Sequence, residues 1–227
     1  MSDARRRAAL FFVAAMAVVG AGVQARADGD RGSWPGSATG RRISVDASGG
    51  WSATGLFGGV TDPGRGTLQL ALHAYFPLIA GPRFALDYTA GIVPVELAVG
   101  TRVARSGTAI LPPPATRTVY GAGVDGLGLT ARFRGLGRWE PYLTALGGVR
   151  LFTDPVPDPR GIRFNFSADI GGGVAVRLAP GRRLRVGFAL HHLSNGGIGQ
   201  ANPSFNGFSV TIGLEGLLSR AAQRARS

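Results

Sequence analysis

The 227-residue chain contains neither cysteine nor lysine, and only 17% of its residues are charged. The absence of cysteine excludes disulfide bonds, which agrees with an exported protein that folds without them. Beyond residue 40 there is also no run of 18 or more apolar residues, so no membrane-spanning helix is expected there. The chain does have 44% hydrophobic residues and 37 glycines, enough for one domain with a sizeable core or one membrane-facing surface.

The first 27 residues have the pattern of a secretory signal peptide. Three arginines at residues 5–7 form a basic start, residues 8–19 are apolar, and Ala25-Arg26-Ala27 fits a cleavage site. An N-terminal membrane anchor is the alternative, but an apolar run this short spans a bilayer poorly. We therefore expect export, a signal peptide over residues 1–27 and a linker over residues 28–40.

Beyond the linker, apolar and polar residues alternate with a period of two, which indicates β-strands rather than helices. In the first of these segments, Ile43 and Val45 share one face while Ser44 and Asp46 share the other. The alternation predicts eight strands, over residues 42–51, 68–76, 84–92, 118–134, 138–152, 162–178, 182–194 and 207–219. The folded domain is thus expected over residues 41–220, followed by a tail at 221–227.

Long strands with one apolar and one polar face favour a membrane barrel over a soluble sandwich or a lipocalin-like barrel. Most of the expected strands exceed the five or six residues typical of soluble sheets. Charged residues also recur on the face opposite the apolar one, which suits a polar lumen inside a lipid-facing wall. The expected fold is all-β, an eight-stranded antiparallel transmembrane β-barrel after a cleaved signal peptide.

The connections between strands predict the orientation of the barrel. Short glycine-containing segments, LIAGPR, RGLGR and APGRR, join the second strand to the third, the fourth to the fifth and the sixth to the seventh. Residues 94–117 and 153–161 form longer connections. Outer-membrane barrels have short turns on the periplasmic side and long loops outside. The strand over residues 182–194 therefore ends at the outer leaflet.

Two polar residues end this strand on its lipid-facing side. His192 and Ser194 continue the parity of the apolar residues Phe188 and Leu190, whereas His191 points into the lumen. An imidazole and a hydroxyl on one face lie side by side, as a histidine base and a serine nucleophile require. On spacing alone, ordinary interfacial residues at a strand end are the simpler interpretation.

The sequence around this pair resembles a known family. The segment HHLSNGGIGQANPSFN is similar to the His-x-Ser-Asn segment and the following Asn-Pro of the outer-membrane lipid A 3-O-deacylases. WEPYLTALGGV and FNFSADIGGGVAV resemble strand patterns of the same family, so the similarity covers the C-terminal half. The family consists of eight-stranded barrels that hydrolyse an acyl ester of lipid A, and the resemblance implies the same fold and reaction.

The resemblance also implies roles for individual residues. Ser194 corresponds to the nucleophile and His192 to the general base. Asn195, Gly197 and Asn202 occupy positions associated with the oxyanion environment, where amide groups stabilise the tetrahedral intermediate.

One position departs from the family pattern. The third member of the family's triad is a glutamate, and the matching residue is Asn206, which has the parity needed to reach the face of His192. An amide can orient an imidazole by accepting its N–H, but it does not balance the imidazolium charge as a carboxylate does. Glu215 and Asp169 have the opposite parity and are expected in the lumen, where Glu215 should pair with an arginine.

The arginines have two expected roles. Three of them, Arg102, Arg105 and Arg117, belong to the predicted long outer loop and could pair with lipid A phosphates. The others considered should neutralise acidic residues in the lumen or lie at its mouths; they are Arg150, Arg163, Arg177, Arg183 and Arg185.

Two other classes of function fit less well. An isoelectric point near 11.6 suits nucleic-acid binding, but neither a helical reader nor a basic sheet with interleaved aromatic residues accompanies the charge. His73, His191 and His192 lack convincing metal-ligand spacing.

The sequence thus leads to the hypothesis of an outer-membrane esterase that removes an ester-linked acyl chain from lipid A, with no cofactor. Its expected partners are lipid A or lipopolysaccharide and membrane lipid, with no nucleic acid; the choice between monomer and homodimer stays open. The alternative is a non-catalytic barrel with a structural or adhesive role, which the asparagine at position 206 favours and the His-x-Ser-Asn segment disfavours.

Overall fold

The structure is a computed structural model that describes residues 42–52, 65–102, 116–134 and 136–216. The predicted signal peptide, linker and tail lie outside the described residues. Within these ranges, the structure contains no helix long and apolar enough to cross a membrane.

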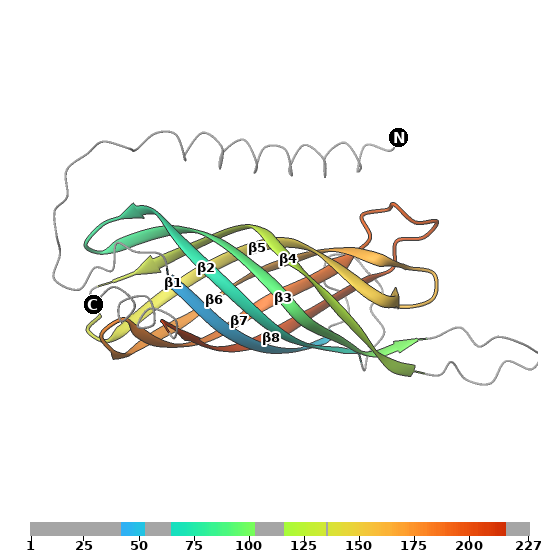
Figure 1. The fold of residues 1–227 in the computed structure, drawn as a ribbon, viewed down its shortest axis with the longest axis horizontal. Coiled ribbons are helices and arrows are strands. Elements are labelled where there is room, and N and C mark those ends of the chain that lie inside the picture. The colour runs from blue at the N-terminus through green and yellow to red at the C-terminus, as the bar shows by residue number, and fades with distance from the viewer. Residues whose placement is uncertain (1–41, 53–64, 103–115, 135, 217–227) are drawn as a thin grey trace, which may run out of the picture.

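Eight antiparallel strands follow one another around a closed barrel, and the first strand pairs with the last (Figure 1). This confirms the predicted fold. The strands are β1 (Arg42–Ser52), β2 (Gly66–Ala80), β3 (Phe84–Arg102), β4 (Thr116–Phe133), β5 (Trp139–Val156), β6 (Ile162–Ala179), β7 (Arg182–Ser194) and β8 (Ser204–Glu215).

The wall of the barrel is apolar outside and polar inside, the reverse of a soluble protein. On β7, Val186 and Phe188 are 46% and 47% exposed, whereas Arg185, just before Val186, is buried in the lumen. Exposed large apolar side chains such as Leu151 and Ile170 recur around the wall. Since apolar surface of this extent is stable only against lipid, the pattern is that of a transmembrane barrel.

Two predicted loops are shorter than expected. The connection expected at residues 94–117 is wrong, because β3 continues to Arg102 and β4 begins at Thr116. Alternation breaks at Pro94, where a bulge between Val93 and Glu96 adds a residue and turns Glu96 inward. The connection expected at residues 153–161 is likewise too long, since β5 continues to Val156 and β6 begins at Ile162.

Strand β8 lies nearer the N-terminus than predicted, at Ser204–Glu215 rather than residues 207–219. It ends where Gly216 adopts a left-handed φ of 89° and donates its N–H to Ile43 O at 2.8 Å. A Cβ at this glycine would collide with Gly181 O, so a side chain is excluded by both conformation and space.

At the end with the short turns, the lumen is filled by ion pairs. Asp87 lies 2.6 Å from Arg42 and 2.8 Å from Arg132. Glu215 lies 3.1 Å from Arg42 and 3.0 Å from Arg183, which confirms the predicted arginine pairing. These side chains are nearly all buried, and their charges offset one another inside the barrel.

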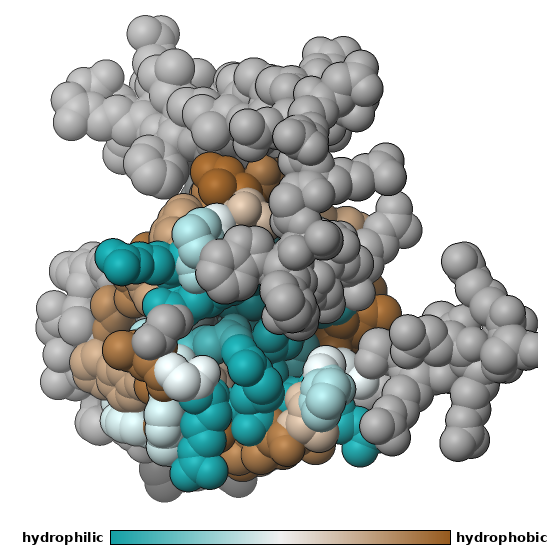
Figure 2. Space-filling model, turned by 90° about the vertical axis from the view of Figure 1, so that its left-hand side faces the viewer, coloured by the Kyte–Doolittle hydropathy of each residue, from teal (hydrophilic) through white to brown (hydrophobic). Residues whose placement is uncertain are grey.

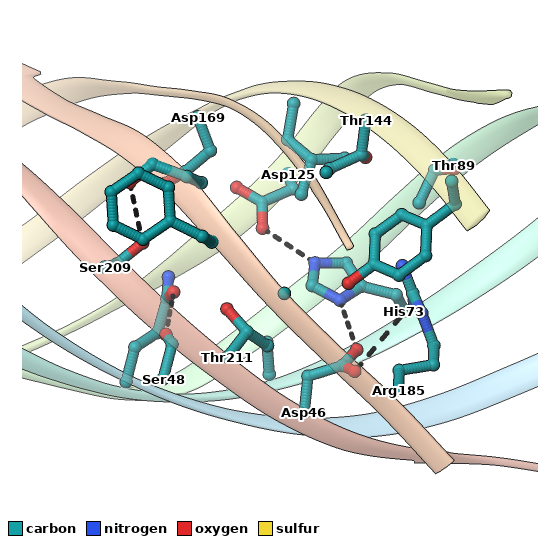
Figure 3. Close-up of a pocket in the computed structure, with 18 of the residues that line it drawn as sticks. Asp46, Ser48, His73, Thr89, Asp125, Thr144, Asp169, Arg185, Ser209 and Thr211 are labelled. Carbon is teal, nitrogen blue, oxygen red and sulfur yellow. Dashed lines mark hydrogen bonds and ion pairs between the residues drawn. The ribbon is translucent and has the colours of Figure 1, made fainter. Parts of the chain in front are cut away.

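The middle of the lumen is polar and encloses a small cavity (Figure 3). Both ring nitrogens of His73 face carboxylates, Asp46 at 2.8 Å and Asp125 at 3.1 Å. Arg150 links Asp125, at 2.9 Å, to Glu96, at 2.6 Å. The polar lumen of this eight-stranded barrel is thus filled by paired side chains and is not open as a pore.

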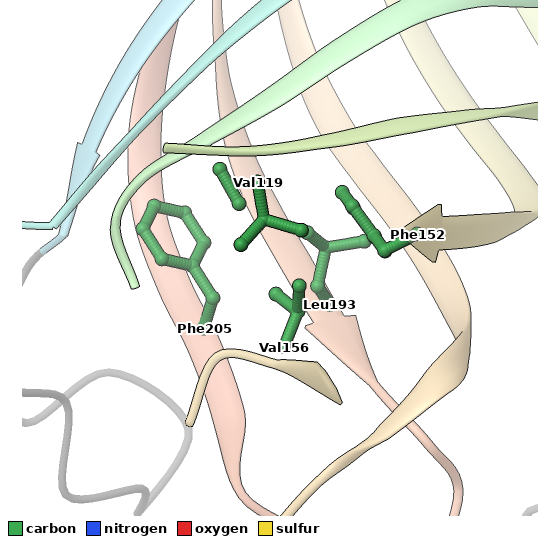
Figure 4. Packing of buried hydrophobic residues seen from close by; sticks show 6 residues of the cluster. Val119, Phe152, Val156, Leu193 and Phe205 are labelled. Carbon is green, nitrogen blue, oxygen red and sulfur yellow. The ribbon is translucent and has the colours of Figure 1, made fainter. Parts of the chain in front are cut away.

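At the opposite end an apolar plug closes the lumen (Figure 4). Each of its members is at most 5% exposed, and they come from five strands. The plug consists of Ala98, Val119, Phe152, Val156, Leu193 and Phe205. It separates the polar lumen from the rim at which β7 ends.

Candidate active site

The pairing of β7 with β8 brings the predicted site residues together. His192 lies opposite Asn206, and Ser194 lies opposite Ser204. His192 and Ser194 have the parity of the exposed Val186 and Phe188, so their side of β7 is the outer wall of the barrel. Ser194 itself is only 8% exposed.

Hydrogen bonds connect three of these side chains in a row. His192 Nε2 lies 2.9 Å from Ser194 Oγ, and His192 Nδ1 lies 2.5 Å from Asn206 Oδ1. A hydroxyl, an imidazole and a group that holds the imidazole thus stand in the order found in serine hydrolases.

Ser204 fixes the orientation of the Asn206 amide. Asn206 Nδ2 donates a hydrogen bond of 3.1 Å to Ser204 Oγ, which leaves Oδ1 directed at His192. An amide oxygen accepts only, so His192 carries its hydrogen on Nδ1 and presents the lone pair of Nε2 to the hydroxyl of Ser194. Ser204 was not among the residues predicted for the site, although it lies two residues before Asn206 and shares its face of β8.

The residues between these outward pairs are anchored inside the barrel. Leu193 pairs with Phe205 across β7 and β8, and both are buried in the apolar plug. His191 also points inward, with Nδ1 2.8 Å from Asp169 Oδ1. The two adjacent histidines therefore face opposite sides of the wall, as predicted.

The loop that follows Ser194 is ordered by its asparagines. Asn195 donates its backbone N–H to Asn202 Oδ1 at 3.1 Å and its Nδ2 to Ala201 O at 2.8 Å. Gly197 donates its N–H to Asn195 Oδ1 at 2.9 Å. Gly196 and Gly197 both have left-handed φ values, 63° and 77°, which glycine adopts without strain. The predicted oxyanion residues thus meet in one loop beside Ser194, where their polar groups bond to one another.

An apolar groove runs along the outer wall from the site. Ala168, Ile170, Leu190 and His192 line it, and the register pairs Ala168 with His192 and Ile170 with Leu190. The groove therefore extends along β6 and β7 from the imidazole toward the middle of the membrane. No pattern in the sequence indicated it, because it depends on small and branched side chains meeting across two strands.

Other predicted candidates lie elsewhere. Asp169 and Glu215 face the lumen, so neither carboxylate supports His192. Arg117 forms an ion pair with Asp154, while Arg105 and the side chain of Arg102 lie outside the described part of the chain. Among the residues described, no three His, Asp or Glu side chains are grouped to hold a metal ion.

Comparisons with known proteins bear on the whole site. Residues 98–215, more than half of the chain, match the family described as lipid A 3-O-deacylase (PagL). The matched region contains β4 to β8 and the end of β3, and so includes every residue of the candidate site. No curated protein sequence matches the chain.

Several solved structures are similar in fold. The crystal structure of the outer membrane enzyme PagL superposes with a TM-score of 0.50 at 19% identity, covering 74% of this chain and 97% of that one. Neisserial surface protein A (NspA) has a TM-score of 0.46 at 11% identity, covering 77% and 95%. The outer membrane protein OprG from Pseudomonas aeruginosa has a TM-score of 0.43 at 10% identity, covering 78% and 94%.

Proposed function

Because this chain belongs to the lipid A 3-O-deacylase family of the bacterial outer membrane, we propose that it hydrolyses an acyl ester of lipid A with Ser194 as nucleophile and His192 as general base. The observation that carries the proposal is the row of hydrogen bonds from Ser194 through His192 to Asn206. Asn206 replaces the expected glutamate, yet its oxygen occupies the orienting position. No cofactor is expected.

The reaction follows from the hydrogen placement. Ser194 Oγ attacks the ester carbonyl carbon while its proton passes to His192 Nε2, 2.9 Å away. The protonated imidazole then gives this proton to the departing sugar hydroxyl, which leaves an acyl group on Ser194. A water molecule attacks the acyl-enzyme with His192 again as base, and the fatty acid is released.

The loop after Ser194 is the proposed oxyanion environment. Gly197 N–H points at Asn195 Oδ1, and the backbone of Asn195 is held by Asn202. Stabilising the intermediate requires Gly197 N–H to exchange the amide oxygen of Asn195 for the oxygen of the substrate. An oxyanion is the stronger acceptor, so this exchange favours the transition state over the ground state.

The apolar groove supports the choice of a lipid substrate. It starts at His192 and continues past Leu190 and Ile170, the latter 61% exposed on the wall. A chain that enters the outer leaflet from a headgroup runs in the same direction, toward the middle of the bilayer. The acyl chain to be removed therefore lies in the groove while its ester stays at the level of Ser194, and no lipid needs to leave the membrane.

Covalent labelling tests the assignment of the nucleophile. Purified protein in detergent micelles is incubated with an alkyl fluorophosphonate, and the modified residue is identified by peptide mass spectrometry. We expect modification of Ser194, loss of labelling in Ser194→Ala and in His192→Ala, and unchanged labelling in Ser209→Ala, whose serine lies in the lumen. Unlabelled wild-type protein, or equal labelling of all four, would refute Ser194 as an activated nucleophile.

A further inference from the structure

The three short turns carry a second feature, which is unrelated to the site at the opposite end. Arg83 lies in the β2–β3 turn, Arg138 in the β4–β5 turn and Arg182 at the start of β7. All three are exposed, and none lies within ion-pair distance of a carboxylate of the described residues. Arg177, half-exposed near the same end, pairs with Glu140 at 3.0 Å.

These arginines belong to one continuous rim. Arg134 donates its backbone N–H to Arg83 O at 2.8 Å, which joins the first turn to the second. Arg177 donates its backbone N–H to Arg138 O at 2.9 Å, which joins the second turn to the third. The three arginines are therefore carried on turns that are far apart in the sequence but joined by backbone hydrogen bonds along one rim.

Acidic groups at this end do not neutralise the positive charge of the arginines at the surface. Asp87, Glu140 and Glu215 are at most 3% exposed and are bound inside the barrel by other arginines. Figure 2 looks onto this end, where hydrophilic residues occupy the middle and hydrophobic residues surround them.

Aromatic residues place the rim at a membrane boundary. Trp139 is 47% exposed, and the guanidinium of Arg138 lies 5.4 Å from the centre of its ring. Phe84 and Phe133 form an exposed pair with ring centres 5.8 Å apart. Aromatic belts of this kind sit at the level of lipid headgroups. The arginines next to them are thus within reach of the phosphates of those headgroups.

We propose that this arginine rim binds anionic phospholipid headgroups in the periplasmic leaflet. Short turns are periplasmic in outer-membrane barrels, and that leaflet contains phospholipid, whereas lipid A lies on the other side. Unpaired guanidinium groups bind phosphate strongly, and an anionic headgroup also lacks the cationic group that would oppose them. The rim therefore holds the barrel at a fixed depth, with the catalytic end in the lipid A leaflet.

Native mass spectrometry of the full-length protein tests this proposal. The protein is released from micelles that contain equal amounts of phosphatidylglycerol and phosphatidylcholine, and the retained lipids are counted. We expect wild type to retain phosphatidylglycerol preferentially. In the triple variant Arg83→Gln/Arg138→Gln/Arg182→Gln, the ratio of retained phosphatidylglycerol to phosphatidylcholine should fall about tenfold. The preference should also fall as salt is raised, because exposed charges are screened.

A second triple variant, Arg117→Gln/Arg160→Gln/Arg163→Gln, removes the same charge from the outer end and serves as control. It should keep the preference, and all three proteins should shift on boiling as folded barrels do. Equal retention of both lipids by wild type, or equal loss in both triple variants, would overturn the proposal. A rim variant that retains phosphatidylglycerol as preferentially as wild type would also overturn it, since the three arginines would then not bind the headgroup.

Discussion

His192 Nδ1 lies 2.5 Å from Asn206 Oδ1, across a directly opposed residue pair of β7 and β8. This contact places a neutral amide where the family resemblance implies a carboxylate. The amide oxygen sets the imidazole tautomer, which is the larger part of what the third triad member contributes. It leaves the positive charge that develops on His192 without a counter-charge.

Replacing Asn206 separates these two contributions. Asn206→Asp keeps the length of the side chain and adds the missing charge, so kcat should rise about tenfold. Asn206→Ala removes both contributions, and kcat should fall by about 100-fold. Steady-state kinetics on lipid A in detergent measures both. If the three proteins turn over equally, Asn206 does not support His192.

Ser204 should act through Asn206 alone. Ser204→Ala removes the acceptor of Asn206 Nδ2, so the amide is free to turn its NH₂ group toward His192, and kcat should fall about tenfold. A carboxylate has two equivalent oxygens and needs no such orientation. Asn206→Asp should therefore restore kcat in the Ser204→Ala background. Absence of this rescue would show that Ser204 acts in another way.

Alanine substitutions of the two adjacent histidines should be harmful for different reasons. His192→Ala should abolish turnover in a normally assembled barrel. His191→Ala instead removes the partner of Asp169, and of Glu96 at 3.6 Å, inside the lumen. Loss of one partner of a buried ion pair costs about 3–5 kcal/mol, so the barrel should unfold at a lower temperature. Heat-modified gel mobility reports folding, and activity per folded barrel should be near normal for His191→Ala. Equal loss of activity in both would contradict the two-sided arrangement.

The apolar plug should hold the site in register. Phe205 lies next to Asn206 and packs on Leu193, which stands between His192 and Ser194. Phe205→Ala should lower kcat about tenfold with little change in KM, and Phe205→Leu should restore most of it. Val119→Ala opens a cavity in the same plug on a distant strand and serves as control. If both alanine variants lower kcat alike, the plug contributes stability only.

Much of this arrangement was predictable from the sequence, because strand parity is a local property. Alternation around Phe188 and Leu190 was enough to direct His192 to the lipid-facing side, and alternation around Phe208 and Val210 did the same for Asn206. The structure brings the two side chains into contact. The inward turn of Glu96 was not predictable, since the bulge after Val93 adds a residue that alternation does not reveal. The groove beside His192 depends on packing between β6 and β7, and Ser204 required the register of β7 with β8.

The most direct test of the account is the mass of lipid A in outer membranes that contain this protein. Membranes with wild type are compared with membranes that contain Ser194→Ala, at equal amounts of folded barrel, and extracted lipid A is analysed by negative-ion mass spectrometry. We predict that wild type removes one ester-linked acyl chain and leaves a free hydroxyl at the 3 position, whereas Ser194→Ala leaves lipid A intact. Identical lipid A in both membranes would contradict the account and would favour a non-catalytic barrel.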